Sequence, residues 1–504
     1  MAKKYEDIAG QIATWIRASA YSSGDKLPSI RYLSQVYRVS ITTVVSALRT
    51  LESRGIVEAR DRVGYYVGKN LQDNETKREF EKINPRNLAG NSFIRDLVNL
   101  NHRSAVPLGS AIPAEDYLPK RQIQRSLLKS ARRASDTLSY SFPGHPQYLA
   151  AIARRMTNIG VTSTEADVIA MSGAQESLIV ALRSVAREGD TVAIGSPTYP
   201  GILHALKVLR LKVVEVPCHR GGPLSFEALE FAVANFDIKA MCISVNVSNP
   251  TGYTFTKDER IRLLRICGGK GIPIIEDDIY GDLYFGNQRP LPLKALDSQG
   301  AVIYCSSFSK TISPGLRAGW IMPGKYYSEV SDQKYFLNLA TPAVTQIAVA
   351  DYLEGGSYDL YLRKIRKIYQ KNVQKLRDLV LNCFPEGTTC SNPDGGYLVW
   401  VTLPFDLDTS EVYETALENG IYFAPGKMFS VAEQNAKCLR ISGAHAVDST
   451  MQASVLYIAE QFREAGNQLP PLREPIRYES CMDQKAKASG EISASTRLNS
   501  SSDT

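Results

Sequence analysis

The stretch SSFSKTISPGLRAG occupies residues 306–319 and sets one lysine behind serines and seven residues ahead of an arginine. Two interpretations of Lys310 are open from these residues alone. It is an ordinary amine in a polar loop, or it forms a Schiff base with an aldehyde cofactor whose phosphate is held by Ser307, Ser309 and Arg317. A short motif of this kind has a high false-positive rate without structural context, so the rest of the chain has to decide.

From about residue 106 onward, short apolar runs alternate with helix-like stretches. Such alternation predicts an α/β domain with a mainly parallel sheet, in which ligands bind beyond the carboxyl ends of the strands. Polar groups that directly follow a strand are therefore candidates for the binding edge, Lys310 among them. The runs predicted as strands are 167–172, 191–196, 211–217, 240–245, 272–277 and 301–307.

Three further polar groups follow predicted strands. SGAQES (172–177) is a small-residue turn that opens a helix, where free N–H groups and the helix dipole suit an anion. In NPTG (249–252) an amide can donate to a ring oxygen. IPIIEDDIY (272–280) ends in carboxylates, and a carboxylate beside a pyridine nitrogen keeps that nitrogen protonated. A metal site is the rival explanation for these acids, but no histidine lies near them.

In this order, the stretches resemble the fold-type I pyridoxal phosphate enzymes, specifically the class I and II aminotransferases, over roughly residues 105 to 465. The resemblance implies pyridoxal 5'-phosphate as the cofactor, in a Schiff base with Lys310. Matched position by position, the family's remaining cofactor and substrate contacts fall on Tyr140, Gly173, Ala174, Gln175, Tyr199, Asn249, Asp277, Tyr280, Ser307, Arg317 and Arg440.

The resemblance also implies a role for each matched residue. Tyr199 stacks on the cofactor ring, Asn249 and Tyr280 flank its phenolic oxygen, and the glycine turn with Ser307 and Arg317 holds the phosphate. Asp277 partners the pyridinium nitrogen and is preferred to Asp278 because of its D-x-x-Y spacing. Arg440 grips a carboxylate of the effector or substrate. Tyr140 reaches the phosphate of the other subunit, so the site requires a dimer.

Positive charge is concentrated at the start of the chain. The whole protein has a formal net charge of +7, and its first seventy residues hold eleven Lys or Arg against six Asp or Glu. A basic surplus is usually only a solvated face. Concentrated in a small domain, it favours a polyanionic partner.

The same region predicts a winged helix. Apolar residues within 8–16 recur at helical spacing, Ser29 begins a second helix over 29–38, and Ser40 begins a third over 40–55. Two helices joined by so short a turn form a helix-turn-helix, and the alternating stretch 56–68 reads as a hairpin. In the second helix, the side chains of Ile30, Leu33 and Val36 are predicted to face the interior of the domain.

The run from Gly24 to Val67 resembles the DNA-binding domain of GntR-type bacterial regulators, in which the arginine matching Arg31 contacts DNA. Hydroxyls at the start of the third helix can reach base edges, and arginines can reach phosphates. A small three-helix domain that binds another protein is the alternative. The predicted DNA-binding residues are Arg31, Arg38, Ser40, Thr42, Thr43, Arg49, Arg60 and Arg62.

Four segments are predicted: a winged helix over 1–69, a polar interdomain linker over 70–105 with a helix near 93–100, the aminotransferase-like domain over 106–465, and a disordered tail over 466–504. The eight cysteines include no C-x-x-C pair, which is typical of reduced thiols in the cytoplasm. The sequence contains no apolar run long enough to predict a membrane span.

A GntR-like winged helix followed by an aminotransferase-like domain is the arrangement of the MocR subfamily of bacterial transcription regulators. The resemblance implies a head-to-tail cytoplasmic homodimer that binds a double-stranded DNA operator and responds to an amine, an amino acid or a B6 vitamer through the Schiff base at Lys310. An active aminotransferase with a DNA-binding appendage is the alternative, because every group needed for transamination is present. A third hypothesis is that the cofactor itself is the signal.

Overall fold

The chain divides into two compact units, Met1–Asn84 and Pro85–Thr504. The boundary falls inside the stretch 70–105 that the sequence suggests as a linker. The expected helix near 93–100 and the tail after residue 466 lie outside the described residues. The structure is a computed structural model, and it describes residues 5, 8–12, 25–37, 39–53, 56–60, 64–67, 83–88, 106–219, 222–432 and 434–466.

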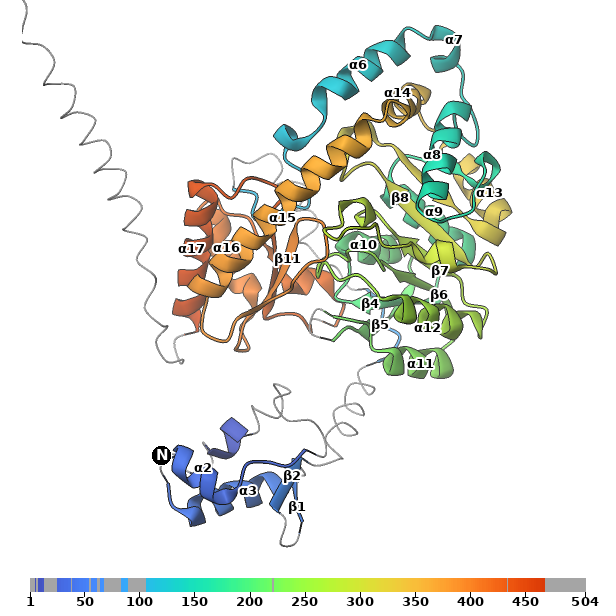
Figure 1. Cartoon of the computed structure of the whole chain (residues 1–504). Helices are drawn as coiled ribbons and strands as arrows, with labels where there is room; N and C mark the ends of the chain where they lie inside the picture. The colour runs from blue at the N-terminus through green and yellow to red at the C-terminus, as the bar shows by residue number, and fades with distance from the viewer. Residues whose placement is uncertain are drawn as a thin grey trace, which may run out of the picture. The chain divides into compact units, whose positions relative to one another are not determined.

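The first unit contains the elements of a helix-turn-helix followed by a hairpin (Figure 1). Ser29 and Ser40 begin the two helices as predicted, because their hydroxyl oxygens accept hydrogen bonds from the backbone N–H groups of Tyr32 and Thr43, each at 3.2 Å. The hairpin strands pair antiparallel with Val57 opposite Val67. The elements are α2 (Ile30–Tyr37), α3 (Ile41–Ser53), β1 (Val57–Arg60) and β2 (Gly64–Val67).

A small apolar core holds these elements together. Leu33 of α2 packs with Leu48 of α3 and with both hairpin strands, and residues 8–12, which are helical, add Ile8 and Ile12. One sequence prediction is wrong, because Val36 is 50% exposed. The helix is only eight residues long, and Leu33 with the partly buried Ile30 and Tyr37 already fills its inward face.

The second unit is built on a seven-stranded sheet in the order β3-β9-β8-β7-β6-β4-β5 (Figure 1). Every neighbouring pair from β8 to β5 is parallel, and only β9 runs against the others. The expectation of a mainly parallel sheet is therefore confirmed. The strands are β3 (Ile169–Met171), β4 (Thr191–Ser196), β5 (Lys212–Pro217), β6 (Ile238–Ile243), β7 (Ile274–Asp277), β8 (Val302–Ser307) and β9 (Gly319–Met322).

Both faces of this sheet are covered, which explains why its strands read as continuous apolar runs. On one face, Tyr304 and Trp320 join a core with α8, α14 and the helix α15 (Ser357–Cys383). On the other face their neighbours Ile303 and Ile321 join a core with α9 and α10. The helices of this part are α6 (Lys120–Ala131), α7 (Ala134–Thr137), α8 (Pro146–Asn158), α9 (Ala174–Val185), α10 (Pro200–Val208), α11 (Phe226–Asn235), α12 (Lys257–Gly268), α13 (Tyr327–Asn338) and α14 (Ala343–Glu354).

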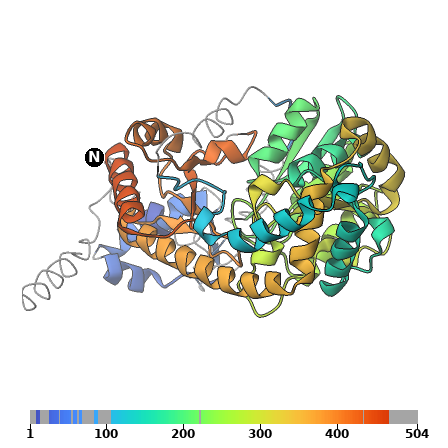
Figure 2. The ribbon, with the colours of Figure 1, turned by 90° about the horizontal axis from the view of Figure 1, so that it is seen from above.

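A second, smaller antiparallel sheet forms the other lobe of this unit, in the order β10-β11-β13-β12. The long helix α15 (Ser357–Cys383) packs on α14 and also on β10, β11 and α17, so it links the two lobes, and Figure 2 shows it in orange along the unit. The remaining elements are β10 (Thr389–Cys390), β11 (Leu398–Thr402), α16 (Thr409–Glu418), β12 (Ala424–Pro425), β13 (Cys438–Ser442) and α17 (Ser449–Ala465).

Part of the predicted linker belongs to the second unit. Arg86 exchanges both backbone hydrogen bonds with Val213 at the edge of the large sheet, each at 2.9 Å, and Leu88 packs on the core of α9 and α10. After a gap in the described residues, Val106 pairs with Ile421 in the smaller lobe. The chain is thus fastened to the large unit on both sides of residues 89–105.

Two smaller findings concern cysteines and membranes. The seven cysteines within the described ranges are all free thiols, and Cys481 lies outside those ranges. Among the helices that the structure describes, none is both long enough and apolar enough to cross a bilayer.

Candidate functional site

The polar groups that follow the strands converge at one edge of the large sheet. They surround a cavity of about 130 Å³. Its walls come from the loops after β3, β4, β6, β7 and β8, whose carboxyl ends meet at this edge because these strands all run in the same direction. The lining residues are Ala174, Gln175, Thr198, Tyr199, Ile202, Ser244, Asn249, Asp277, Ile279, Tyr280, Ser309, Lys310 and Arg317.

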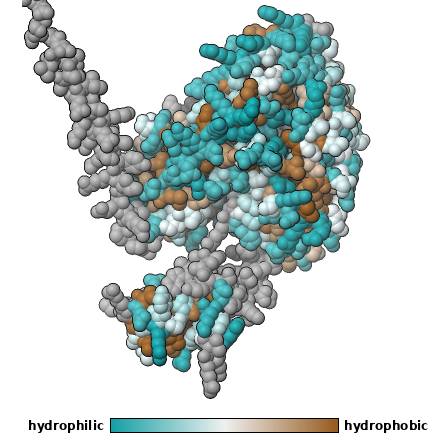
Figure 3. Space-filling model, in the orientation of Figure 1, coloured by the Kyte–Doolittle hydropathy of each residue, from teal (hydrophilic) through white to brown (hydrophobic). Residues whose placement is uncertain are grey.

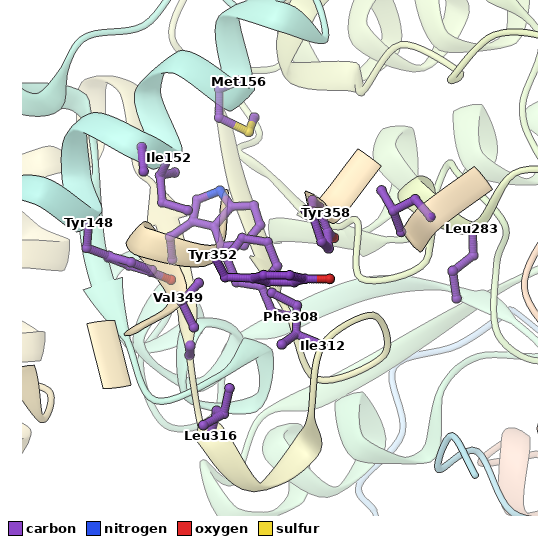
Figure 4. Packing of buried hydrophobic residues seen from close by; sticks show 14 of the residues in the cluster. Tyr148, Ile152, Met156, Leu283, Phe308, Ile312, Leu316, Val349, Tyr352 and Tyr358 are labelled. Carbon is purple, nitrogen blue, oxygen red and sulfur yellow. The ribbon is translucent and has the colours of Figure 1, made fainter. Parts of the chain in front are cut away.

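Lys310 is held in the cavity by the residues on either side of it. Phe308 packs on Trp320 and Tyr358, at 4.8 and 5.8 Å between ring centroids, and Ile312 enters the same core (Figure 4). Burial lowers the pKa of Lys310 to about 8, and the nearby positive charge of Arg440 acts in the same direction. A substantial fraction of the amine is therefore unprotonated near neutral pH, as a nucleophilic lysine requires.

Asp277 ends β7 in the wall of the cavity. Burial, together with the negative charge of Asp278, raises the pKa of its carboxyl group to about 7. Its Oδ1 atom is buried without a hydrogen-bond partner among the described residues. Asp278 points elsewhere, because its carboxylate accepts hydrogen bonds from Arg289 at 2.7 Å and Tyr304 at 2.9 Å. Of the two acids, only Asp277 lines the cavity.

A buried arginine stands behind the cavity. Arg440 on β13 donates to Oδ1 of Asn249 at 3.0 Å and to the carbonyl oxygen of Gly109 at 2.6 Å, and its guanidinium lies 5.0 Å from the ring centroid of Phe429. Its Nε–H has no partner within the described part of the chain. Tyr280 lies buried nearby with its ring edge-on to Tyr397 at 5.5 Å.

A cluster of hydrogen-bond donors lies at the N-terminus of α9. Gly173 has a positive φ of 97°, and a Cβ atom there would lie 2.5 Å from the guanidinium of Arg317, so only glycine fits. Arg317 also bonds to the carbonyl oxygen of Ser172 at 2.7 Å and the hydroxyl of Ser309 at 3.3 Å. Ser307 stands behind the cavity wall and bonds to Ser309 at 3.1 Å. Backbone N–H groups, hydroxyls and a guanidinium are the donors that phosphate binds.

The sequence did not reveal that backbone carbonyls also reach this site. Lys310 donates to the carbonyl oxygen of Ala111 at 2.8 Å, and Tyr397 donates to the same oxygen at 2.8 Å. The carbonyl oxygen of Gly109 accepts a hydrogen bond from one terminal nitrogen of the Arg440 guanidinium. Every residue has a backbone carbonyl group, so the sequence does not indicate which of them reaches a site. The one available signal is Gly109, where a Cβ atom would lie 2.5 Å from the backbone of Phe423.

Tyr140 is not among the residues that line the cavity. Its side chain is 79% exposed on the surface of the second unit. Its predicted role, in the site of a partner subunit, remains a prediction. Thr198, Ile202, Ser244 and Ile279 line the cavity without having been predicted, because small or apolar side chains are common after any strand.

Six of the eight predicted DNA-binding residues fall within the described part of the first unit. Arg31, Thr42 and Arg49 are exposed, Thr43 is half-buried, and the hydroxyl of Ser40 bonds to the hydroxyls of both threonines at 2.7 Å. Arg60 pairs with Glu58 and lies 4.1 Å from the ring centroid of Tyr66. Arg38 and Arg62 lie outside the described residues.

The fold and the cavity together define a class of protein. A mainly parallel sheet with an acid at the end of β7, a lysine after β8 and a buried arginine from a second lobe is the architecture of the class I and II aminotransferases. Residues 108–456 match the family model "Aminotransferase class I and II", and residues 4–67 match "Bacterial regulatory proteins, gntR family". The chain belongs to the class I and II aminotransferase family and carries a GntR-type helix-turn-helix ahead of that domain.

Relatives that match along most of this chain carry the names of regulators. The chain is 33% identical to the HTH-type transcriptional regulator YdcR of Escherichia coli over 88% of this chain and 95% of YdcR. It is 28% identical to the HTH-type transcriptional regulator NorG of Staphylococcus aureus over 83% of this chain and 95% of NorG. These matches agree with the MocR-type arrangement that the sequence predicts.

Solved structures resemble the second unit. The kynurenine aminotransferase of Pyrococcus horikoshii aligns with a TM-score of 0.69 and 25% identity, over 75% of this chain and 95% of that one. The multiple substrate aminotransferase of Thermococcus profundus aligns with a TM-score of 0.70 and 25% identity, over 76% of this chain and 97% of that one. The aminotransferase fold is therefore present nearly whole.

Proposed function

We propose that this protein is a DNA-binding transcription regulator whose aminotransferase-like domain binds pyridoxal 5'-phosphate and senses an amine, an amino acid or a B6 vitamer. The GntR-type domain and the regulator names of its relatives support DNA binding. The chemistry of the cavity supports the cofactor. We expect the protein to work in the bacterial cytoplasm, where both DNA and the vitamers are found.

The donor set around the cavity fits pyridoxal 5'-phosphate. The buried Oδ1 of Asp277 lacks a partner among the described residues and suits a protonated pyridine nitrogen. The cradle formed by Gly173, Ser309 and Arg317 suits the phosphate, and Tyr199 offers an aromatic ring beside the cavity. When bound, the cofactor supplies an aldehyde that condenses with amines and a ring that withdraws electrons.

The chain's own residues prepare this chemistry. The lowered pKa of Lys310 leaves part of its Nζ unprotonated and able to attack an aldehyde or to accept a proton. Asp277 takes its charged form readily once a cation is beside it, because an opposite charge offsets the burial that raises its pKa. Arg440 has an Nε–H without a partner among the described residues and can exchange its hydrogen bond to Gly109 for one to a carboxylate.

One observation carries the sensor hypothesis. Lys310 in the cavity and Arg440 behind it donate to the carbonyl oxygens of Ala111 and Gly109, in the segment that follows residues 89–105. The carboxylate of an amino acid would compete with the Gly109 carbonyl oxygen for Arg440, and the aldehyde of a bound cofactor would take the Lys310 nitrogen from the Ala111 carbonyl oxygen. Binding therefore disturbs residues 109–111, which continue through Val106 towards the linker. A ligand shifts a conformational equilibrium only where it binds two states unequally, and this competition supplies the difference.

We further propose a head-to-tail homodimer. Tyr140 is 79% exposed and Phe336 is 83% exposed, and Leu138 and Leu339 are exposed as well. Large apolar side chains on these segments are typical of a surface that a second subunit covers. The partner's Tyr140 would then complete the phosphate site.

A catalytically active aminotransferase is the second candidate. It is favoured by the same cavity, because Lys310, Asp277 and Arg440 are the groups that transamination needs. In that case the regulator would turn over its effector, and the winged helix would need a separate explanation.

One titration separates the candidates. The protein is loaded with pyridoxal 5'-phosphate, and amino acids and B6 vitamers are added while visible absorbance and the anisotropy of a fluorescent promoter duplex are recorded together. A sensor shows a compound that changes both signals without producing a keto acid. Keto-acid production at ordinary enzymatic rates with unchanged DNA affinity would overturn the proposal in favour of the aminotransferase.

A further inference from the structure

The long helix α15 (Ser357–Cys383) carries a line of lysines along its solvent face. Lys364, Lys367, Lys371 and Lys375 are separated by three, four and four residues, so they project from one side of the helix. All four are exposed. Figure 3 shows hydrophilic side chains gathered on the face where Figure 1 draws α15. We call these four residues the lysine row.

The positive charges of the lysine row are not balanced by ion pairs with acidic side chains in the described residues. In the parts of the chain that the structure describes, none of its four ammonium groups forms an ion pair, although exposed cations elsewhere do, such as Arg154 with Glu354. The nearest acid at row spacing, Asp378, is already engaged by the side chain of Gln374 at 2.8 Å. Four like charges along one helix repel one another, and an external polyanion relieves that repulsion.

A hollow adjoins one end of the row. It has a volume of about 860 Å³ and is lined by Lys364 and Tyr361 of α15 on one side and by Arg121 at the start of α6 on the other. Arg121 likewise has no ion-pair partner among the described residues. The hollow is also lined by Lys120 and Asp116, which pair at 3.4 Å, so its charged lining residues are three cations and one acid and it continues the positive surface.

The length of the row suits a nucleic-acid backbone. Eleven residues of α-helix separate the first lysine from the last, which is about 16 Å at 1.5 Å per residue. One DNA strand carries a phosphate about every 3.4 Å of helix axis, so the row faces about five phosphates. Lysine is suited to this contact because it acts as a point charge that does not require a fixed geometry.

We infer that the lysine row of α15 is a second DNA-contacting surface, on the aminotransferase-like domain itself, that binds duplex phosphates without reading sequence. The inference rests on the proposed DNA binding and goes beyond it, because the GntR-type domain would otherwise make all the contacts. The row lies on the helix that links the two lobes, so this contact also joins the DNA to the part of the fold that surrounds the cavity.

The test uses the full-length protein and a fluorescein-labelled 60-base-pair duplex of mixed sequence. Dissociation constants are measured by anisotropy over a range of salt concentrations. The variant K364Q/K367Q/K371Q/K375Q removes the row. Each lost phosphate contact lowers the salt slope by about 0.9, so we expect a decrease of roughly 3 to 4 and binding at least about tenfold weaker at low salt.

Two matched variants control this result. K212Q/K257Q/K270Q/K325Q removes the same charge from four exposed lysines on other elements and should lower the slope by less than about one unit. K364R/K367R/K371R/K375R keeps the charge and should retain the full slope. Equal losses in the row variant and the scattered variant would overturn the inference, because net charge alone would then account for the effect.

Arg31→Ala separates failure of this inference from failure of the proposed function. If Arg31→Ala weakens binding and the row variant does not, the second surface is wrong while the DNA-binding regulator stands. If the wild-type protein binds neither this duplex nor a promoter duplex, both are wrong. An unchanged thermal midpoint in the row variant is expected, because exposed lysines without ion pairs contribute little to stability.

Discussion

The cavity of the second unit and the helix-turn-helix of the first unit use charge in opposite ways. Around the cavity, Asp277 and Arg440 are almost fully buried, and burial shifts the pKa values of Asp277 and Lys310 towards neutrality. On the first unit, Arg31 and Arg49 remain in water. Burial makes a charge reactive and specific for one small partner, whereas exposure leaves it available to a long polyanion and sensitive to salt.

The sharpest test of the buried region is Lys310→Ala. Lys310 is the lysine that lines the cavity, so the variant should lose all of the visible absorbance that added pyridoxal 5'-phosphate gives the wild type. The absorbance spectrum of the desalted protein measures this. Lys427→Ala is the control, because Lys427 belongs to the same unit but pairs with Asp408 at 2.7 Å. Absorbance retained by Lys310→Ala would contradict the lysine assignment.

The next largest effect concerns pH. With a pKa of about 8 for Lys310, about a quarter of the amine is unprotonated at pH 7.5, against about one part in a thousand for an ordinary lysine. The rate at which cofactor-free protein captures pyridoxal 5'-phosphate should therefore rise with pH and level off above about 8. Stopped-flow absorbance measures this rate, with N-acetyl-lysine as the reference amine. A rate that keeps rising beyond pH 10 would mean that burial does not perturb Lys310.

Arg440→Ala probes the carboxylate contact. Losing a buried, charge-assisted hydrogen bond costs about 2 kcal/mol or more, so an amino-acid effector should bind about 30-fold or more weakly. Spectroscopic titration of the cofactor-loaded protein gives the affinity. The amine made by removing the carboxylate from the same amino acid serves as the control, and its affinity should be unchanged. Equal weakening for both compounds would assign Arg440 a structural role, through Asn249 and Gly109, instead of carboxylate binding.

The smallest effect is expected on the exposed region. Arg31→Ala should remove one phosphate contact, lower the salt slope of DNA binding by about 0.9 and weaken binding roughly fivefold to tenfold at low salt. Anisotropy of a promoter duplex at several salt concentrations measures both quantities. Arg31→Lys keeps the charge and should keep the slope. If Arg31→Ala leaves the slope unchanged, Arg31 makes no phosphate contact.

The prediction from sequence succeeded where a local pattern reports a local structure. Ser29 and Ser40 begin their helices as expected, and the six predicted apolar runs became strands of the large sheet because both faces of that sheet are buried. It failed at Val36. In a short amphipathic helix, the position of the neighbouring helix decides which side chains are buried. It also missed β9, an antiparallel strand of four residues that runs directly out of the loop holding Lys310.

The site divides in the same way. Residue types and their order after the strands suggested Lys310, Asn249 and the acids that end the run 272–277, because a lysine after an apolar strand and an acid at the end of another limit the chemistry to a few families. The resemblance to the aminotransferases added Arg440 and the choice of Asp277. The sequence could not show that Lys310 and Arg440 are held by the carbonyl oxygens of Ala111 and Gly109. Backbone carbonyl groups are the same in every residue, so only the path of the chain decides where they lie.

The sequence by itself determined the two-part organisation, the fold class and the chemical types present at the site, since hydrophobic periodicity and residue identity are written in the chain. Tertiary structure decided which acid faces the cavity, how burial moves the pKa values of Lys310 and Asp277, and which segment competes for the two cations. The physical reason is that desolvation and hydrogen-bond competition arise between residues distant in sequence. Their strength depends on distances that only the folded chain fixes.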